Sequence, residues 1–288
     1  KHAPPIQPVV PIKTAKPISI QGDVGMHHIV QRGETLSRIA TMHNTTWQNL
    51  ATLNNIQNPS RLTVGQRLIV RNPAPQPTPT ATTGQITHTQ VRHPVGNLWT
   101  NVHVFSMPRN TRARVVGTVP GTIRPTRQRG ELVINGGFFW DGHPIGPTAI
   151  NGVRHGFEKP NFFPLDLDRL EFVSATAGTN VVSVYPRLVV GGVARHTTVE
   201  AYLKPRHPRT AIGWNNERMF IVVADGRTPQ SAGLTMQQLA EYMRSLGCTE
   251  AANLDGGGSS VAVYNGQIVN RPSDGSERPV VTAIVFNG

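Results

Sequence analysis

The 288-residue sequence is poor in cysteine and in charged side chains. It has one cysteine, Cys248, so no disulfide can form within the chain. Charged residues make up only 15% of the chain and hydrophobic residues 38%, so most of the chain can bury a core. No apolar run approaches the roughly 18 residues of a membrane span, and we expect no transmembrane segment.

Acidic residues are scarce relative to basic ones, which gives a formal net charge of +12. Only five of the 28 basic residues are Lys; the rest are Arg, whose planar guanidinium suits phosphate or carboxylate. Such a charge fits nucleic acid, an anionic cell wall or a membrane surface. Because no nucleic-acid-binding motif accompanies it, we expect no nucleic acid partner. The histidines lack zinc-ligand spacing, and we predict no required metal.

Composition divides the chain into four segments. Residues 1–26 are rich in Pro and Val without an amphipathic period, which predicts an extended arm. The stretch PPIQPVVPI is apolar for a free tail, so self-association through this arm stays open. Residues 72–84 form a Pro/Thr linker between a compact unit at 27–71 and a domain at 85–288. The opening KHAPPIQPVV resembles the start of a mature secreted chain.

The compact unit has the order strand, helix, helix, strand. Short strands are expected at residues 29–31 and 67–70. Thr35 can cap the first helix, and Thr45 or Thr46 the second.

This unit resembles a LysM domain over its whole length. The segments VQRGETLSRIA, LATLN and LTVGQRLIV stand at that family's spacing. The resemblance implies binding of N-acetylglucosamine-containing glycans such as peptidoglycan or chitin. It also implies a groove between the loop after the first strand and the loop before the last. The glycan-binding candidates in these loops are Gly33, Glu34, Thr35, Asn58, Pro59, Ser60 and Arg61.

The large domain alternates strands and turns and has one clear helix, expected at residues 235–246. A capping box at Thr235 begins this helix and Gly247 ends it. Asn265 and Gly266 predict a hairpin turn between SVAVY and QIVN. Together these elements predict an α+β domain with a mixed or antiparallel sheet, joined to a small βααβ module.

Polar groups in this domain cluster at strand ends, where strands would deliver them to one rim. Two carboxylates can act as acid and base, or as base and stabiliser. Two arginines can hold non-bridging phosphate oxygens, and glycines can point backbone N–H groups at an anion. The polar groups are Asn135, Arg209, Asp225, Asp255, Glu277 and Arg278.

The motifs NGGFF, PRTAIG, DGR, NLDGGGSS and ERPV occur in the order found in the phosphodiester glycosidase family, which residues 85–288 resemble. The resemblance implies removal of a sugar from a sugar-1-phosphate diester, which leaves a phosphomonoester. Asp255 is our first choice for the proton donor and Asp225 the second. Asn135 and Glu277 complete the catalytic candidates, although Glu277 could instead pair with Arg278. The substrate-binding candidates are Arg209, Arg278, Gly256, Gly257, Gly258, Ser259, Ser260, Gly136 and Gly137.

These patterns predict a secreted, cell-wall-associated hydrolase that needs no cofactor. A divalent cation such as calcium near the acidic site stays open. The alternative function is a non-catalytic cell-envelope protein that retains the glycosidase fold and docks to neighbours through its arm. A peptidoglycan amidase is disfavoured because metal-ligand spacing is absent.

Overall fold

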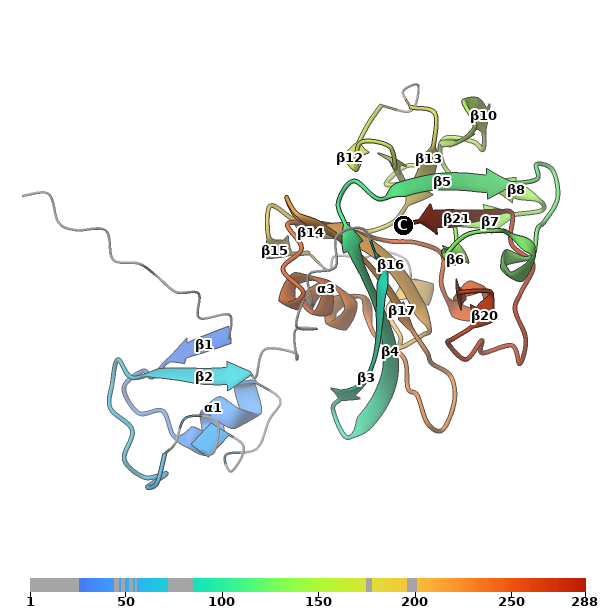
Figure 1. Ribbon diagram of the computed structural model, residues 1–288. Helices are drawn as coiled ribbons and strands as arrows, with labels where there is room; N and C mark the ends of the chain where they lie inside the picture. Colours follow the sequence, from blue (N-terminus) through green and yellow to red (C-terminus); the bar gives the residue numbers. More distant parts are fainter. Residues whose placement is uncertain are drawn as a thin grey trace, which may run out of the picture. The chain divides into compact units, whose positions relative to one another are not determined.

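The chain forms two compact units, Lys1–Pro73 and Ala74–Gly288, in the computed structural model (Figure 1). The structure describes residues 26–43, 47, 50–51, 54, 56–71, 85–174, 178–195 and 201–288. The predicted linker, the arm up to residue 25 and both capping candidates for the second small helix lie outside these residues. Within the described part, no helix is long and apolar enough to cross a membrane.

The first unit pairs strands β1 (Met26–Ile29) and β2 (Arg67–Arg71) in antiparallel fashion. Helix α1 (Leu36–Met42) begins after Thr35, whose hydroxyl accepts a hydrogen bond from the Arg38 N–H at 3.3 Å. This contact confirms the predicted cap. The helix and strand share one small core, composed of Val30, Leu36, Ile39, Ala40, Leu50, Leu68 and Val70.

The first strand ends at Ile29, two residues before the predicted end. The chain turns there because the Gln31 N–H donates to the Glu34 carboxylate at 2.8 Å. Gly33 completes the turn with φ of +83°, a conformation that favours glycine.

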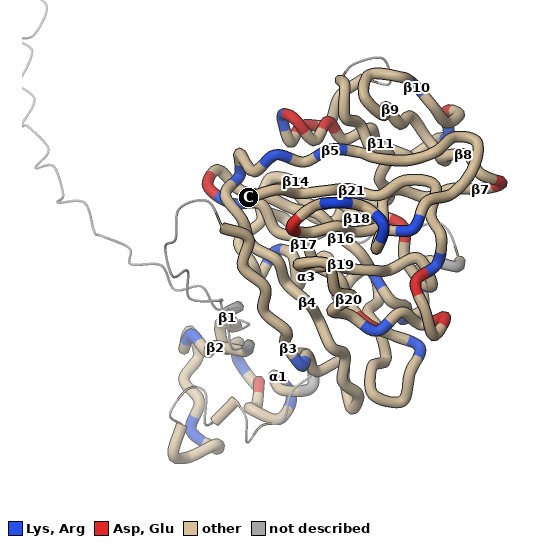
Figure 2. Tube along the Cα trace, turned by 45° about the vertical axis from the view of Figure 1, so that its right-hand side comes forward, with Lys and Arg blue, Asp and Glu red and all other residues tan. Residues whose placement is uncertain are grey.

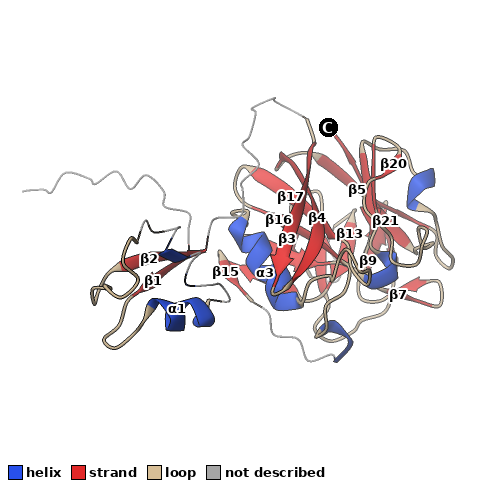
Figure 3. Ribbon diagram, turned by 90° about the horizontal axis from the view of Figure 1, so that it is seen from below, coloured by secondary structure: helices blue, strands red, loops and turns tan. Residues whose placement is uncertain are grey.

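The second unit contains three larger sheets and a small hairpin, and all pairings between their described strands are antiparallel (Figure 3). The seven-stranded sheet has the order β15 (Val193–Ala194), β14 (Arg187–Val190), β18 (Glu250–Asn253), β16 (Arg209–Trp214), β17 (Arg218–Ala224), β4 (Leu98–Pro108) and β3 (Thr87–Val95). One five-stranded sheet has the order β20 (Gln267–Ile268), β19 (Ala262–Tyr264), β6 (Leu132–Asn135), β21 (Thr282–Asn287) and β5 (Arg112–Gly117). The other has the order β10 (Val153–His155), β9 (Thr148–Ile150), β13 (Val181–Val184), β11 (Phe163–Asp166) and β12 (Glu171–Phe172). The hairpin consists of β7 (Phe139–Trp140) and β8 (His143–Pro144).

Strand β17 is buried on both faces, which explains its uninterrupted apolar run. Ile221 and Val223 face a core shared with the sheet that contains β6 and β21. Phe220 and Val222 face a second core that includes residues of helix α3 (Met236–Ser245). Because side chains alternate along a strand, a strand between two cores must be apolar at every position.

Helix α3 and the β19–β20 hairpin confirm their sequence predictions. Thr235 accepts from the Gln238 N–H, and the Gln238 side chain accepts from the Thr235 N–H, as in a capping box. Asn265 and Gly266 have φ of +50° and +78°, as a two-residue hairpin turn requires.

The predicted α+β class holds only in a coarse sense, because the described part of the second unit is mostly β and antiparallel. Besides α3 it shows only three short 3₁₀ turns, namely η1 (Pro125–Arg127), η2 (Ala201–Leu203) and η3 (Gly257–Ser259). Figure 3 shows how little helix accompanies the strands.

Candidate active site

Three neighbouring strands, β18, β16 and β17, bring predicted site residues to one rim of the largest sheet. Arg209 begins β16 beside the end of β17, which Asp225 follows. The chain after β18 stays beside β16, because the Gly257 N–H donates to the Pro208 carbonyl at 2.9 Å. Asp255, Arg209 and Asp225 therefore lie in a row across adjacent strands. At about 4.8 Å per strand, the two aspartates are roughly 10 Å apart.

Asn135 ends β6 and is fully buried at this rim. Its side-chain oxygen accepts from the Thr210 hydroxyl at 2.8 Å and from the Val261 N–H at 3.2 Å. Its amide donates to the Asp255 carbonyl at 2.8 Å. Asn135 was predicted among the catalytic residues, but these bonds make it a residue that positions the Asp255 loop.

Asp255 is a half-buried carboxyl at the start of the glycine triplet. Burial raises its pKa to about 6, while Ser259, the Gly256 N–H and Arg278 favour the charged form and limit the rise. The Gly256 N–H donates to Asp255 Oδ1 at 2.8 Å. A carboxyl with this pKa can gain or lose a proton near neutral pH, as an acid–base catalyst must.

The glycine triplet leaves room for arginine side chains directly against the backbone. A Cβ atom at Gly257 would stand 3.1 Å from the guanidinium nitrogens of Arg227. A Cβ atom at Gly258 would overlap the Arg278 guanidinium and the Asp274 carboxylate. Side chains at these positions would therefore displace the two guanidinium groups.

The sequence predicted that Arg209 binds the phosphate of a substrate, but in the structure its guanidinium bonds to backbone carbonyls. It is almost fully buried, and its guanidinium donates to the carbonyls of Leu203 (2.7 Å), Pro205 (2.8 Å) and Leu234 (3.0 Å). Burial, and then the nearby charge of Arg227, lower its pKa to about 10. Arg209 thus holds the surrounding loops together beneath the rim.

Arg227 is the exposed guanidinium that the sequence analysis missed. It lies against Gly257, and its Nε donates to His207 Nδ1 at 3.2 Å. The motif DGR was interpreted through its aspartate alone, so the arginine at its third position was not named.

Arg278, a predicted phosphate ligand, lies at the site and pairs with Asp274. Its Nε and Nη2 donate to Asp274 Oδ2 at 2.9 and 2.6 Å. Both side chains are close to 40% exposed, so a ligand can reach them. Asp274 was not among the predicted site residues.

Asp225 is almost fully buried next to a pair of histidines. One of its oxygens accepts from the Arg271 N–H at 2.8 Å, and the other lies 3.9 Å from His103 Nε2. His103 Nδ1 lies 3.1 Å from His88 Nε2. Asp225 therefore anchors the loop that leads to Arg278.

Glu277 does not pair with Arg278. Its carboxylate accepts from both the backbone N–H and the hydroxyl of Thr126, and it faces Arg124 at 3.8 Å. The carboxylate therefore holds η1, a segment about 150 residues earlier in the chain. These partners, rather than reacting groups, account for the burial of this predicted catalytic residue.

The two predicted serines are buried behind the glycine triplet. Ser259 lies beside Asp255 and favours its charged form. The Ser260 carbonyl accepts from the Asn270 side chain at 3.1 Å. The Asn270 side chain therefore fixes the backbone of the loop at Ser260.

Gly136 and Gly137 allow the end of β6 to pack closely against its neighbours. A Cβ atom at Gly136 would stand 2.8 Å from the Thr282 carbonyl oxygen, and one at Gly137 would stand 2.5 Å from that of Ser183. The Gly136 carbonyl accepts from the Asp255 N–H at 3.2 Å. Both predicted substrate-binding glycines therefore have a packing role next to the site.

In the first unit, the predicted glycan-binding loop after β1 is shaped by its own bonds. The Glu34 carboxylate contacts His28 Nε2 at 2.7 Å, and this hydrogen bond lowers the pKa of Glu34. Gly33 forms the turn and Thr35 caps α1, so all three residues shape this loop.

The second predicted loop offers more free polar surface. Asn58, Ser60 and Arg61 are exposed, and Pro59 is half-buried. Asn58 Oδ1 accepts from the Ser60 N–H at 3.0 Å, which fixes the turn, while Asn58 itself stays exposed.

Two family models match parts of this chain. A model described as phosphodiester glycosidase matches residues 128–287, and the LysM domain model matches residues 28–71. The chain belongs to the phosphodiester glycosidase family. Both family resemblances drawn from the sequence are confirmed.

Similar proteins include the SPbeta prophage-derived protein YomE of Bacillus subtilis, 40% identical over 91 residues, which are 31% of this chain and 14% of YomE. The mouse and human N-acetylglucosamine-1-phosphodiester α-N-acetylglucosaminidases are 45% and 40% identical over 67 residues. Those residues are 23% of this chain and 13% of each enzyme. The matches thus span a small part of each relative's length.

Two solved structures share the fold. The catalytic domain of the zebrafish N-acetylglucosamine-1-phosphodiester α-N-acetylglucosaminidase, auto-inhibited by its pro-peptide, matches with a TM-score of 0.58 at 18% identity, over 74% of this chain and 86% of that domain. A Synechocystis protein matches with a TM-score of 0.54 at 16% identity, over 70% and 62% of the two chains.

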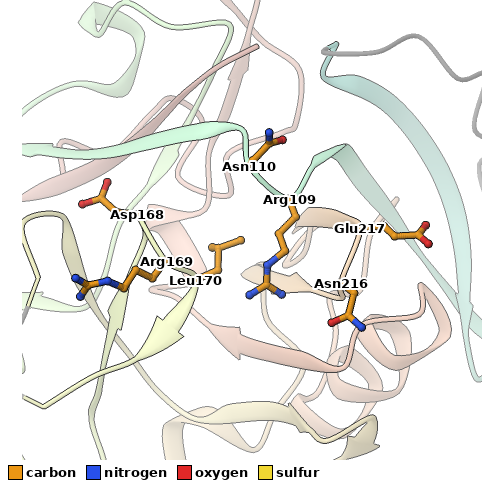
Figure 4. Close-up of a pocket in the computed structure, with 7 residues that line it drawn as sticks. All are labelled: Arg109, Asn110, Asp168, Arg169, Leu170, Asn216 and Glu217. Carbon is orange, nitrogen blue, oxygen red and sulfur yellow. The ribbon is translucent and has the colours of Figure 1, made fainter.

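A surface pocket lies at the other end of β17 from the rim that carries Asp255 (Figure 4). It has a volume of about 340 Å³ and is formed by turns next to β4, β12 and β17. Its lining residues are Arg109, Asn110, Asp168, Arg169, Leu170, Asn216 and Glu217. None of them was a predicted site residue, and we base the function on the rim of Asp255 instead.

The charges at the rim fit an anion better than a cation. In the described part of the chain, no three His, Cys, Asp or Glu side chains gather as a metal site needs. A cation beside Asp255 would meet Arg278 and the neighbouring Arg227. Basic residues also occur in many other parts of the second unit, so net charge alone does not mark the site (Figure 2).

Proposed function

We propose that the chain is a cell-wall-associated hydrolase that releases a sugar from a sugar-1-phosphate diester. The main support is that Asp255, with its raised pKa, lies at the same rim as two exposed guanidinium groups, which contact the glycine triplet. Family membership and the similarity to the mouse and human N-acetylglucosamine-1-phosphodiester α-N-acetylglucosaminidases support the same reaction class.

In this proposal Asp255 is the proton donor. The bond between the anomeric carbon and its phosphate oxygen breaks, and that oxygen takes the proton from Asp255. Water supplies hydroxide to the anomeric carbon, and its remaining proton restores the acid. A sugar and a phosphomonoester leave. Asp225 is the weaker candidate because it is buried and already bonded to the Arg271 N–H.

The proposed phosphate clamp consists of Arg227 and Arg278. Both are exposed and lie on successive glycines, so two guanidinium groups can hold the two non-bridging oxygens. Arg227 takes the phosphate-binding role that the sequence analysis gave to Arg209, because N–H groups of Arg209 already donate to three backbone carbonyls.

The LysM domain is proposed to hold the enzyme on peptidoglycan or chitin, which places it at a cell wall or extracellular surface. Tethering raises the local concentration of a wall-borne phosphodiester without a new active-site contact.

The tether is tested by pull-down of the full chain with insoluble peptidoglycan or chitin. We expect binding that an N-acetylglucosamine oligomer displaces and that salt alone does not abolish. The salt control is needed because a chain with a net charge of +12 can also attract an anionic wall through charge alone. Asn58→Ala should weaken binding and Ile29→Ala, on the exposed side of β1, should not. Binding that disappears with salt and ignores the oligomer would contradict the proposal.

The activity is tested with a panel of sugar-1-phosphate diesters, assayed for both products. We expect one sugar and one phosphomonoester for each diester consumed. A chain that binds wall glycan but turns over no member of the panel would favour the non-catalytic envelope protein.

A further inference from the structure

The carboxylate of Asp274 occupies the position over the glycine triplet where the proposed function needs an anion. Asp274 and the Arg278 guanidinium both lie against Gly258, and Arg278 directs two of its N–H groups at one Asp274 oxygen. A carboxylate and a phosphate present similar oxygens to a guanidinium.

The segment that carries Asp274 is fixed on both sides and exposed between. Arg271 is held by its N–H bond to Asp225, and Glu277 is held by Thr126. Asp274 lies between these anchors, next to Gly275, whose φ of +85° marks a turn. The side chain can therefore leave Arg278 by rotation, while the loop stays in place.

The ion pair between Asp274 and Arg278 is also weak enough for a ligand to break. Asp274 and Arg278 are 38% and 43% exposed, and exposed ion pairs contribute little to stability because water screens them. A ligand that bonds Arg278 and also reaches a second guanidinium has an advantage over Asp274, which meets one guanidinium through Oδ2 and a long hydrogen bond from the Ser273 hydroxyl through Oδ1, at 3.5 Å.

We propose that Asp274 is an internal competitor for the anion site, and that a phosphodiester binds by displacing it from Arg278. This inference rests on the proposed function. Asp274 thereby sets which anions enter: a phosphate that spans Arg227 and Arg278 displaces it, and a lone carboxylate, which offers Arg278 no more than Asp274 does, is rejected.

The test is calorimetric titration of the full chain with inorganic phosphate and, separately, with acetate. Asp274→Asn keeps a residue that suits the turn and removes the competing charge. We expect it to tighten phosphate binding about two- to fivefold, the range of an exposed ion pair, and to make acetate binding measurable. Glu217→Gln, the same charge change at the other end of β17, should leave both affinities unchanged.

A double-mutant cycle separates competition from simple charge removal. In an Arg278→Gln background, Asp274→Asn should have almost no further effect, because there is no guanidinium left to release. An equal gain in that background would show a through-space charge effect and overturn the proposal. Weaker phosphate binding by Asp274→Asn would also overturn it, because Asp274 would then position Arg278.

The outcomes also separate this inference from the proposed function. If Arg278→Gln weakens phosphate binding and Asp274→Asn changes nothing, the anion site stands and the competitor is refuted. If Arg278→Gln binds phosphate as the unmodified chain does, Arg278 is not in the anion site, and both the clamp and the competitor fail.

Discussion

The two ends of strand β17 differ in what they offer a ligand. The end before Arg218 borders an open pocket whose mixed charges come from surface turns. The end after Ala224 borders Asp255, whose carboxyl pKa is raised, and two guanidinium groups that lie on glycine backbone. The first end has an open pocket, and the second has an acidic group and two basic groups close together. The proposed function therefore rests on the second end of β17 and not on the pocket.

Replacing Asp255 by Asn should produce the largest difference in activity between variants at the two ends of β17. The amide keeps the shape and cannot carry the proton, so kcat should fall about 10²–10⁴-fold, the usual contribution of general acid–base catalysis. Glu217→Gln at the opposite end should stay close to the unmodified rate. Steady-state kinetics with a phosphodiester substrate gives both numbers, and melting temperatures show that both variants fold. An Asp255→Asn variant within a few-fold of the unmodified chain would move the proton-transfer role to Asp225.

Arg227→Lys and Arg278→Lys should have the next largest effect. Each loses one charge-assisted contact to phosphate, which costs about 1.5–3 kcal/mol, or roughly 10- to 150-fold in kcat/KM. Arg109→Lys, the matched change in the pocket, should have little effect. Equal losses in all three variants would mean that net charge, and no specific clamp, draws in the substrate.

Gly257→Ala should have the smallest effect. It separates the cost of backbone strain at a positive φ from the effect of a methyl group that meets the Arg227 guanidinium. Gly257 and Gly191 both have positive φ, so Ala costs on the order of 1 kcal/mol of stability at either position. Of these two positions, Gly257 is the one where a Cβ meets a guanidinium, that of Arg227, while Gly191 faces open space. Melting temperatures should therefore fall alike, and kcat/KM should fall several-fold for Gly257→Ala alone. A loss of activity in Gly191→Ala would point to global destabilisation.

Local features of the second unit followed well from the sequence. Helix α3 was predictable because its capping box and apolar stripe lie within one short segment, and the Asn265–Gly266 hairpin was predictable for the same reason. Asp255 was singled out because the motif NLDGGGSS resembles that of the phosphodiester glycosidase family.

The roles of three charged residues could not be predicted, because distant segments decide them. Arg209 is buried by carbonyls from residues 203–205 and 234, which close over it only in the folded chain. The Glu277 carboxylate accepts a hydrogen bond from Thr126, about 150 residues away. Arg227 was overlooked because nothing local to DGR shows that Gly257 will lie beneath it.

The pH dependence of kcat/KM for a phosphodiester substrate tests the central claim most directly. This parameter reports the pKa of the free enzyme's essential acid. If Asp255 donates the proton, it must be protonated, and its pKa of about 6 means that kcat/KM is highest below that pH and falls as pH rises through it. A profile that stays flat across that range, or that rises with pH, would contradict proton donation by Asp255.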